Sequence, residues 1–295
     1  MTFPVSGVTT WIFLPPLVAF FVSLFASMGG VSGAFLLLPF QVSILHFVSP
    51  AVSATNFVYN IVAIPSGVYR YMREGRMVWP LACTTILGTL PGVLLGYYIR
   101  VWYLPDPKVF KLFVGCVLFY VGARLLREMT GGPRWNGVLL YANFDSGAKV
   151  KLVRHSLRIV EYEFCGEKFS FRIPAMVALA FVVGIVGGAY GIGGGSIIAP
   201  FCVALFGLPV YTVAGAALLG TFLTSIAGVF FYSVIPSGVP TAPDWPLGIL
   251  FGFGGILGMY CGARLQKFAP QRMIKTMLGI MLTFLAVSYL VQFFA

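Results

Sequence analysis

Two glycine-rich stretches are the groups in this chain most able to bind a ligand. They read GGVSGAFLLLPF at Gly29–Phe40 and YGIGGGSIIAPF at Tyr190–Phe201. Each lies inside a hydrophobic run, where a cluster of glycines destabilises a helix. A helix that restarts after such a break presents unsatisfied N–H groups and the positive end of its dipole, which together bind anions without a charged side chain. The two breaks are therefore candidate anion-binding sites.

The expected ligand contacts come from the breaks and from the apolar segments beside them. At the breaks they are Ser32, Gly33, Gly193, Gly194, Gly195 and Ser196. In the neighbouring segments they are the polar side chains Gln41, Asn56, Asn60 and Thr221, with further hydroxyls such as Thr224 and Ser225 completing the lining. Close helix packing explains many membrane glycines, and hydrogen bonding between helices explains single polar side chains. As a set beside three consecutive glycines, these residues favour a binding site.

Other reactive side chains have simpler interpretations. His46 leaves a proton-coupling role open, but a histidine near the end of a short helix is more often interfacial. Arg70 at a helix end attracts anions or anchors the helix, and anchoring is the favoured interpretation. The five cysteines are scattered without a C-x-x-C pair, so we expect isolated apolar thiols rather than a metal or redox site. No cofactor is expected.

Composition predicts a multi-pass membrane protein. The 295 residues are 59% hydrophobic and only 9% charged, against about 25% charged in a typical soluble domain. Residues 1–69 and 173–243 contain no Asp, Glu, Lys or Arg, and several segments reach the ~20 apolar residues of a spanning helix. The N-terminus shows no basic region or clear cleavage site, so we expect no signal peptide. We expect the basic residues behind the net charge of +11 to set the orientation of the helices in the membrane and to contact anionic lipid headgroups, rather than to bind nucleic acid.

The expected membrane segments contain almost no acids, Glu128 at a helix end being the exception. Cation pumps and many proton-coupled carriers rely on intramembrane carboxylates, so this interior suits an anion. The segments also contain no Ser/His/Asp set, no H-E-x-x-H and no carboxylate pair, and the glycine runs lack the lysine of a P-loop. We therefore expect no enzymatic activity.

The chain is an internal duplication. Pro39 and Pro200 are separated by the same number of residues as Gly33 and Gly194. Trp-Pro-Leu opens a segment in each half, and within that segment glycines recur at every fourth position. The repeat covers about residues 11–128 and 174–294. Paired Gly/Pro interruptions at matching places in two halves are typical of a transporter's binding site.

Each half contains five apolar elements. We expect them at 11–28, 33–48, 51–70, 78–99 and 109–128, and at 174–189, 194–207, 210–231, 245–265 and 273–294. The second element of each half barely crosses a ~30 Å hydrocarbon core. The first two elements are therefore either two crossings or a re-entrant pair, and the sequence leaves both open. Either way the number of crossings is odd, so the second half is expected to be inverted.

Charge placement agrees with inverted repeats. Arg70, Arg73 and Arg76 follow the third element, whereas the equivalent loop 233–244 has no Lys or Arg. If the basic loops lie on the cytoplasmic side of the membrane, the central segment also lies on that side and both termini lie on the outer side. Arg100 does not fit, since it falls on the outer side with Lys108 and Lys111. In inverted halves the two breaks can meet near the middle of the membrane from opposite sides.

These patterns predict that the chain is divided into three parts. They are a first transmembrane repeat at 1–129, a β-rich insert at 130–172 and a second repeat at 173–295. Within the insert, VLLYANF, KVKLV, RIVEYEF and KFSFR have strand character and predict a β meander or hairpin pair on the cytoplasmic face. Its excess of basic residues favours a solvated linker beside anionic lipid and leaves a regulatory role open. The predicted fold class is all-α and polytopic, with broken or re-entrant glycine-rich helices.

The paired glycine motifs, each followed by proline and later by Trp-Pro-Leu with spaced glycines, resemble the sulfite exporter TauE/SafE family. GIGGGSIIAP matches the family pattern closely, whereas GGVSGAFLLLP has Ser32 and Ala34 where glycines would be expected. The resemblance implies a secondary transporter that exports sulfite or organosulfonate anions across the bacterial inner membrane, with a homodimer possible. Its partners would be a small anion and the lipid bilayer. The alternatives are an anion channel using the same helix ends and a non-transporting scaffold.

Overall fold

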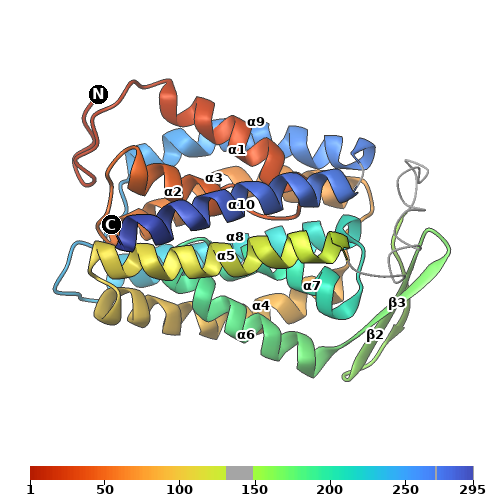
Figure 1. Cartoon of the computed structure of the whole chain (residues 1–295). Helices are drawn as coiled ribbons and strands as arrows, with labels where there is room; N and C mark the ends of the chain where they lie inside the picture. The colour runs from red at the N-terminus through yellow and green to blue at the C-terminus, as the bar shows by residue number, and fades with distance from the viewer. Residues whose placement is uncertain (131–148, 270, 295) are drawn as a thin grey trace.

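The computed structural model describes residues 1–130, 149–269 and 271–294. Within these ranges the protein is an elongated bundle of helices with a small sheet at one end (Figure 1). The first half contains α1 Leu14–Met28, α2 Ala34–Ser43, α3 Ala51–Arg73, α4 Trp79–Tyr98, the π-helical turn η1 Ile99–Tyr103, and α5 Pro107–Thr130. The second half contains α6 Ile173–Tyr190, the 3-10 turn η4 Gly194–Ile197, α7 Ile198–Phe206, α8 Val210–Val234, α9 Trp245–Leu265, the 3-10 turn η5 Gln266–Phe268, and α10 Gln271–Phe294. A helix thus occupies every apolar element that the sequence predicts.

Local sequence explains where several helices begin and end. α4 and α9 each begin with Trp-Pro, and proline suits the first helical turn because its missing N–H would have no helical partner there. The Asp244 carboxylate caps α9 by accepting a hydrogen bond from the Leu247 amide at 3.2 Å. α6 ends at Gly191, which takes the left-handed conformation of a helix C-cap.

The helices confirm a multi-pass membrane protein. Four are long and apolar enough to cross a membrane, namely Trp79–Tyr103, Ile173–Tyr190, Val210–Val234 and Trp245–Leu265. Large apolar side chains on the outside of the bundle, such as Leu87, Phe253 and Phe284, are 60–71% exposed, as suits a surface that faces lipid. α1 and α2 are apolar but shorter than a full crossing.

The glycines that recur at every fourth position of α4 and α9 lie where these helices contact others. α4 packs on α6, and α9 packs on α1. A Cβ on Gly88 would lie 2.5 Å from the Val177 carbonyl oxygen of α6, and one on Gly258 would overlap the Phe20 carbonyl of α1. Small residues let the two backbones approach closely, so these glycines serve packing.

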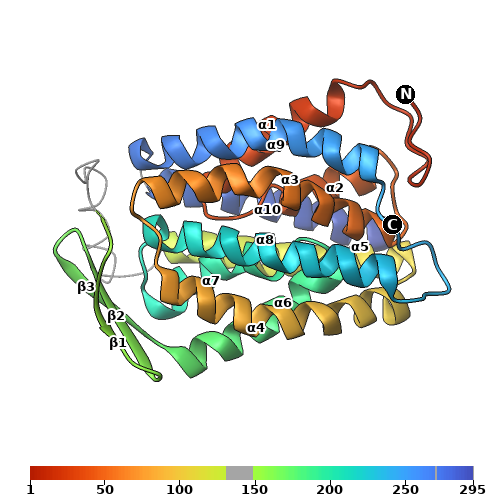
Figure 2. The ribbon, with the colours of Figure 1, turned by 180° about the vertical axis from the view of Figure 1, so that it is seen from behind.

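The insert forms an antiparallel sheet in the order β1–β2–β3. Its strands are β1 Lys151–His155, β2 Ile159–Phe164 and β3 Glu167–Arg172, which confirms the meander expected over this stretch. The predicted strand VLLYANF lies outside the described residues. Tyr162 of β2 is fully buried, and its hydroxyl lies 2.9 Å from that of Thr212 near the start of α8. Seen from behind, the sheet again lies at one end of the bundle, with both termini at the opposite end (Figure 2).

Candidate functional site

The two glycine breaks lie in the interior of the bundle. The first runs from Gly29 to Gly33 between α1 and α2, the second from Gly191 to Gly193 between α6 and η4, and every residue of both is buried. Gly191 and Gly193 have φ angles of +83° and +81°, a conformation that L side chains rarely adopt. A Cβ on Gly191 would also overlap the Ser53 side chain of α3. Glycine is therefore required here both by the turn and by its closeness to the first half of the chain.

Asn60 of α3 joins the two breaks. The Ser32 hydroxyl, in the first break, donates a hydrogen bond to the Asn60 side-chain oxygen. The Asn60 side-chain nitrogen donates to the Ile192 carbonyl, in the second break, and to the Ser225 hydroxyl of α8, each at 3.0 Å. One fully buried amide of α3 thus contacts both breaks and α8 of the second half. We call Asn60, Ser32, Ile192 and Ser225 the Asn60 junction.

The remaining predicted residues of the second break gather around Thr221 of α8. The Ser196 hydroxyl lies 3.4 Å from that of Thr221 and donates to the Ile192 carbonyl at 2.6 Å. A Cβ on Gly193 would lie 2.9 Å from Thr221 Cγ2, and one on Gly195 would lie 2.5 Å from the Thr221 amide nitrogen. The second break therefore packs directly against the hydroxyl-bearing face of α8.

Amides at the helix starts already have partners in this conformation. The Gly194 amide donates to the Thr224 hydroxyl at 3.2 Å, and the Ser196 amide donates to the Gly193 carbonyl at 3.2 Å. At the first break the Ala34 amide donates to the Ser32 hydroxyl at 3.2 Å. These three amides could bind another acceptor only by giving up their internal ones, and we call this internally bonded conformation closed.

Gln41 and Asn56 retain unused hydrogen-bonding capacity beside the junction. The Gln41 side-chain nitrogen donates to the Asn56 side-chain oxygen at 2.6 Å. The other two polar atoms, Gln41 Oε1 and Asn56 Nδ2, are buried without a partner. A buried polar group in this state costs about 1–3 kcal/mol. Asn56 precedes Asn60 by one helical turn, so the unused donor lies on the face of α3 that carries the junction. The unused acceptor belongs to Gln41 of α2, which bonds Asn56.

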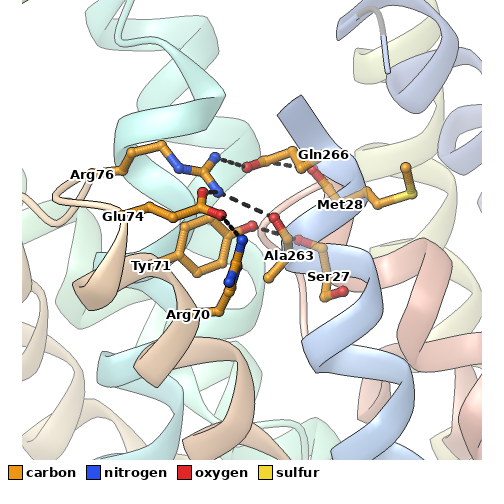
Figure 3. Close-up of polar contacts among 8 residues, drawn as sticks. All are labelled: Ser27, Met28, Arg70, Tyr71, Glu74, Arg76, Ala263 and Gln266. Carbon is orange, nitrogen blue, oxygen red and sulfur yellow. Dashed lines mark hydrogen bonds and ion pairs between the residues drawn. The ribbon is translucent and has the colours of Figure 1, made fainter. Parts of the chain in front are cut away.

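A polar cluster at the sheet end of the bundle holds the end of α1, directly before the first break (Figure 3). The last carbonyls of a helix have no partner within it. Here the Tyr71 hydroxyl donates to the Ser27 carbonyl at 3.1 Å, and the Gln266 side chain donates to the Met28 carbonyl at 2.7 Å. Tyr71 comes from α3 and Gln266 from η5, so both halves of the chain fix this helix end.

Arg76 connects the cluster. Its guanidinium donates to the Gln266 side-chain oxygen at 2.7 Å and to the Ala263 carbonyl at 3.1 Å, and it pairs with Glu74. Arg70 pairs with the other Glu74 oxygen at 2.6 Å, which matches the anchoring interpretation. Sequence reasoning used Arg76 only as an orientation signal and missed this role, since nothing in the local pattern indicates that Gln266 lies beside it.

His46 lies exposed in the loop after α2, as an interfacial residue would.

Comparison with known proteins gives matches to membrane transporters. The family model for the sulfite exporter TauE/SafE matches residues 16–289. The chain is 23% identical to the probable membrane transporter protein YunE of Bacillus subtilis over 74% of both chains. It is 29% identical to the probable membrane transporter protein MJ0441 of Methanocaldococcus jannaschii over 42% of this chain and 46% of that one. The probable membrane transporter protein YdhB of Bacillus subtilis is 28% identical over 40% and 46%. No solved structure gives a significant match.

Proposed function

Because the chain belongs to the sulfite exporter TauE/SafE family of membrane transporters, we propose that it carries a sulfite-like or organosulfonate anion across the bacterial inner membrane by alternating access. The protein is a transporter and not an enzyme. The anion and the mechanism are our inference from the site. The substrate-binding residues we propose are those predicted at the two breaks, together with Gln41, Asn56, Asn60 and Thr221.

The observation that carries this proposal is the Asn60 junction together with the neighbouring residues Gln41 and Asn56, each of which has one buried polar atom without a partner. A sulfite or sulfonate group offers several acceptor oxygens and needs several donors. Asn56 Nδ2 is an unused donor, and the Gly194 amide becomes one if Thr224 moves away. The junction and the pair contain no carboxylate, so no full negative charge there repels an anion.

Packing between the halves supports inverted repeats with re-entrant pairs. The first helix of each half packs on the fourth helix of the other, α1 on α9 and α6 on α4. The equivalent helices α3 and α8 pack on each other, as do α5 and α10. α2 lies toward the end of the bundle with the termini, and α7 lies toward the sheet (Figures 1 and 2). This exchange of partners is what a two-fold relation between repeats at 1–129 and 173–295 would produce.

In the proposed cycle the anion replaces internal hydrogen bonds at the breaks. On entering, it accepts from the Gly194 amide in place of the Thr224 hydroxyl and from Asn56 Nδ2. The insert at 130–172 stays on the cytoplasmic side, and the cycle requires no cofactor. When the anion leaves toward the other side, the closed arrangement described above forms again.

Anion uptake into proteoliposomes tests this function. Sulfite, sulfoacetate, taurine, thiosulfate and sulfate are compared, and we expect saturable transport of one of the sulfur oxyanions. The double variant Gln41→Leu/Asn56→Leu removes both unpartnered atoms, so its fold should keep wild-type thermal stability or gain some, while transport should fall at least tenfold.

The matched control is Ser66→Ala, also on α3, whose hydroxyl bonds only the Ala63 and Ile256 carbonyls at 2.8 Å. It should transport like wild type. Wild-type transport by the double variant would show that the pair does not bind substrate. Linear flux with single-channel currents would instead favour the channel alternative.

A further inference from the structure

Arg100 is a basic residue that falls on the outer side of the predicted topology. The structure shows that it is buried and therefore does not act as a topology signal at the membrane surface. It is 0% exposed and lies in the π-helical turn η1 at the end of α4, inside the candidate span Trp79–Tyr103. This turn lies at the end of the bundle with the termini (Figure 1). Buried cations in membrane segments are costly and mark functional sites, and π-helical turns frequently occur at such sites.

The Arg100 guanidinium has one edge without any partner. Its Nη1 donates to the Leu104 carbonyl, and its plane lies over the Phe110 ring, 3.7 Å from the centroid. Nε and Nη2 are buried and unpartnered, and among the described residues no carboxylate pairs with Arg100. In a guanidinium these two nitrogens share one edge, the fork that binds two oxygens of a single oxyanion.

At the opposite end of the bundle, Arg76 has a similar arrangement but also a carboxylate partner. Tyr71 and Tyr232 are equivalent in the repeat, and Tyr232 donates to the Gly188 carbonyl near the end of α6 at 3.4 Å, as Tyr71 does to Ser27 of α1. Arg76 lies over the Tyr71 ring, 4.7 Å from the centroid. Tyr97, three residues before Arg100, packs edge to face against Tyr232 with ring centroids 4.8 Å apart. Arg76, however, pairs with Glu74, which it shares with Arg70 (Figure 3), whereas none of the carboxylates in the described part of the chain pairs with Arg100.

We propose that Arg100 forms a second oxyanion-binding site, at the end of the bundle with the termini and separate from the glycine breaks. The free edge binds two oxygens of a sulfite, sulfonate or phosphate group, and the charge of that group balances the buried cation. Through Tyr232 the site adjoins the end of α6, which leads into the second break. The ligand chemistry is the same whether the oxyanion is a free ion or a lipid phosphate, and the proposal stands independently of the transported substrate.

Thermal unfolding of the purified protein tests the site. Sodium sulfite and sodium phosphate are each compared with sodium chloride at equal ionic strength. We expect a concentration-dependent rise in the unfolding temperature that is lost in Arg100→Gln and weakened in Arg100→Lys, because lysine keeps the charge but not the fork. Lys108→Gln, which removes an exposed cation near the same end, is the matched control and should keep the full shift.

A second arm identifies the source of the oxyanion. The same variants are reconstituted with phosphatidylglycerol or with phosphatidylcholine, whose phosphate is balanced by its own cation. A rise in the unfolding temperature that depends on Arg100 and occurs only with phosphatidylglycerol assigns the site to a lipid phosphate. A wild-type response of Arg100→Gln to every probe overturns the proposal. If Arg100→Gln does not fold, a wild-type response of Arg100→Lys overturns it instead. Neither result bears on the proposed function, which the Gln41/Asn56 variant tests.

Discussion

At the scale of single residues, the candidate site depends on side-chain amides. Asn60 uses both ends of its amide to join the two breaks, whereas Asn56, one turn earlier, leaves its nitrogen without a partner. The two residues look equivalent in the sequence. Their difference suggests a division of roles, in which Asn60 holds the breaks together and Asn56 offers a donor to the substrate.

Replacing Asn60 should affect stability as well as transport. Asn60→Ala leaves the buried Ser32 hydroxyl without its acceptor and removes one of the two donors to the Ile192 carbonyl, so we expect a loss of about 1–3 kcal/mol. Asn60→Asp adds a negative charge at the junction and should reduce anion uptake further than Asn60→Ala. Thermal unfolding and uptake kinetics measure the two effects. Thr84→Ala is the control, since Thr84 bonds only carbonyls of its own helix and should behave like wild type. Equal uptake by the Ala and Asp variants would contradict an anion at the junction.

At the scale of elements, each break depends on what packs against it. The second break contacts α3 at Ser53 and α8 at Thr221. The first break follows a helix end that is held by Tyr71 and Gln266. A gate built from broken helices requires the ends to stay in place while the breaks change partners. Both contacts can be tested separately.

The glycines of the second break should tolerate no Cβ. In Gly195→Ala the new methyl group would lie 2.5 Å from the Thr221 amide nitrogen, so α8 must shift and we expect a loss of about 1–3 kcal/mol. Gly238→Ala is the matched control, because nothing lies within 4 Å of its Cβ position. Thermal unfolding of the two variants measures the difference. Equal stability would mean that the break and α8 are not in close contact.

Removing the Arg76 guanidinium should loosen the end of α1. Arg76→Gln removes one of the two arginines that pair with Glu74 and leaves the Gln266 side-chain oxygen without its donor, at a site where Arg76 is 2% exposed. We therefore expect a loss of about 1–3 kcal/mol. Arg73→Gln removes an exposed arginine of the same segment and should change the stability by less than about 0.5 kcal/mol. The measurement is thermal unfolding of both proteins in the same detergent. A small effect for Arg76→Gln would show that the cluster does not hold the helix.

At the scale of the whole molecule, the proposed topology places the sheet in the cytoplasm and both termini outside. Cys165 lies exposed in the turn between β2 and β3, and Val5 lies exposed in the N-terminal segment. With the other cysteines replaced by serine, a membrane-impermeant maleimide should label Cys165 only from the cytoplasmic side. In a further variant, Val5→Cys with Cys165→Ser, the maleimide should label position 5 only from the outer side of the membrane. Labelling of both positions from one side would contradict the topology.

The labelling of Cys165 should also depend on pH. Partial burial of the Cys165 thiol, together with the charge of Glu167, raises its pKa. The reactive thiolate is therefore scarcer than at an ordinary cysteine at neutral pH, and the labelling rate should rise as the pH increases. Glu167→Gln removes the charge contribution, lowers that pKa and should speed labelling at neutral pH. A rate unchanged by this substitution would show that Glu167 has no influence on the thiol.

The sequence by itself determined the class of the protein and most of its elements. Apolar runs and the alternating strands of the insert are local patterns, so they predicted the helices and the meander. The spaced glycines are a local pattern too, but the helices that they pack against came from the structure. Repeated motifs also indicated the family. Only the tertiary structure decided that Asn60 joins the breaks, that Arg76 holds α1 through Gln266, and that Arg100 is buried and pairs with no acid among the described residues. Such contacts join side chains far apart in the chain, and they depend on how each helix is rotated against its neighbours, which no local pattern encodes.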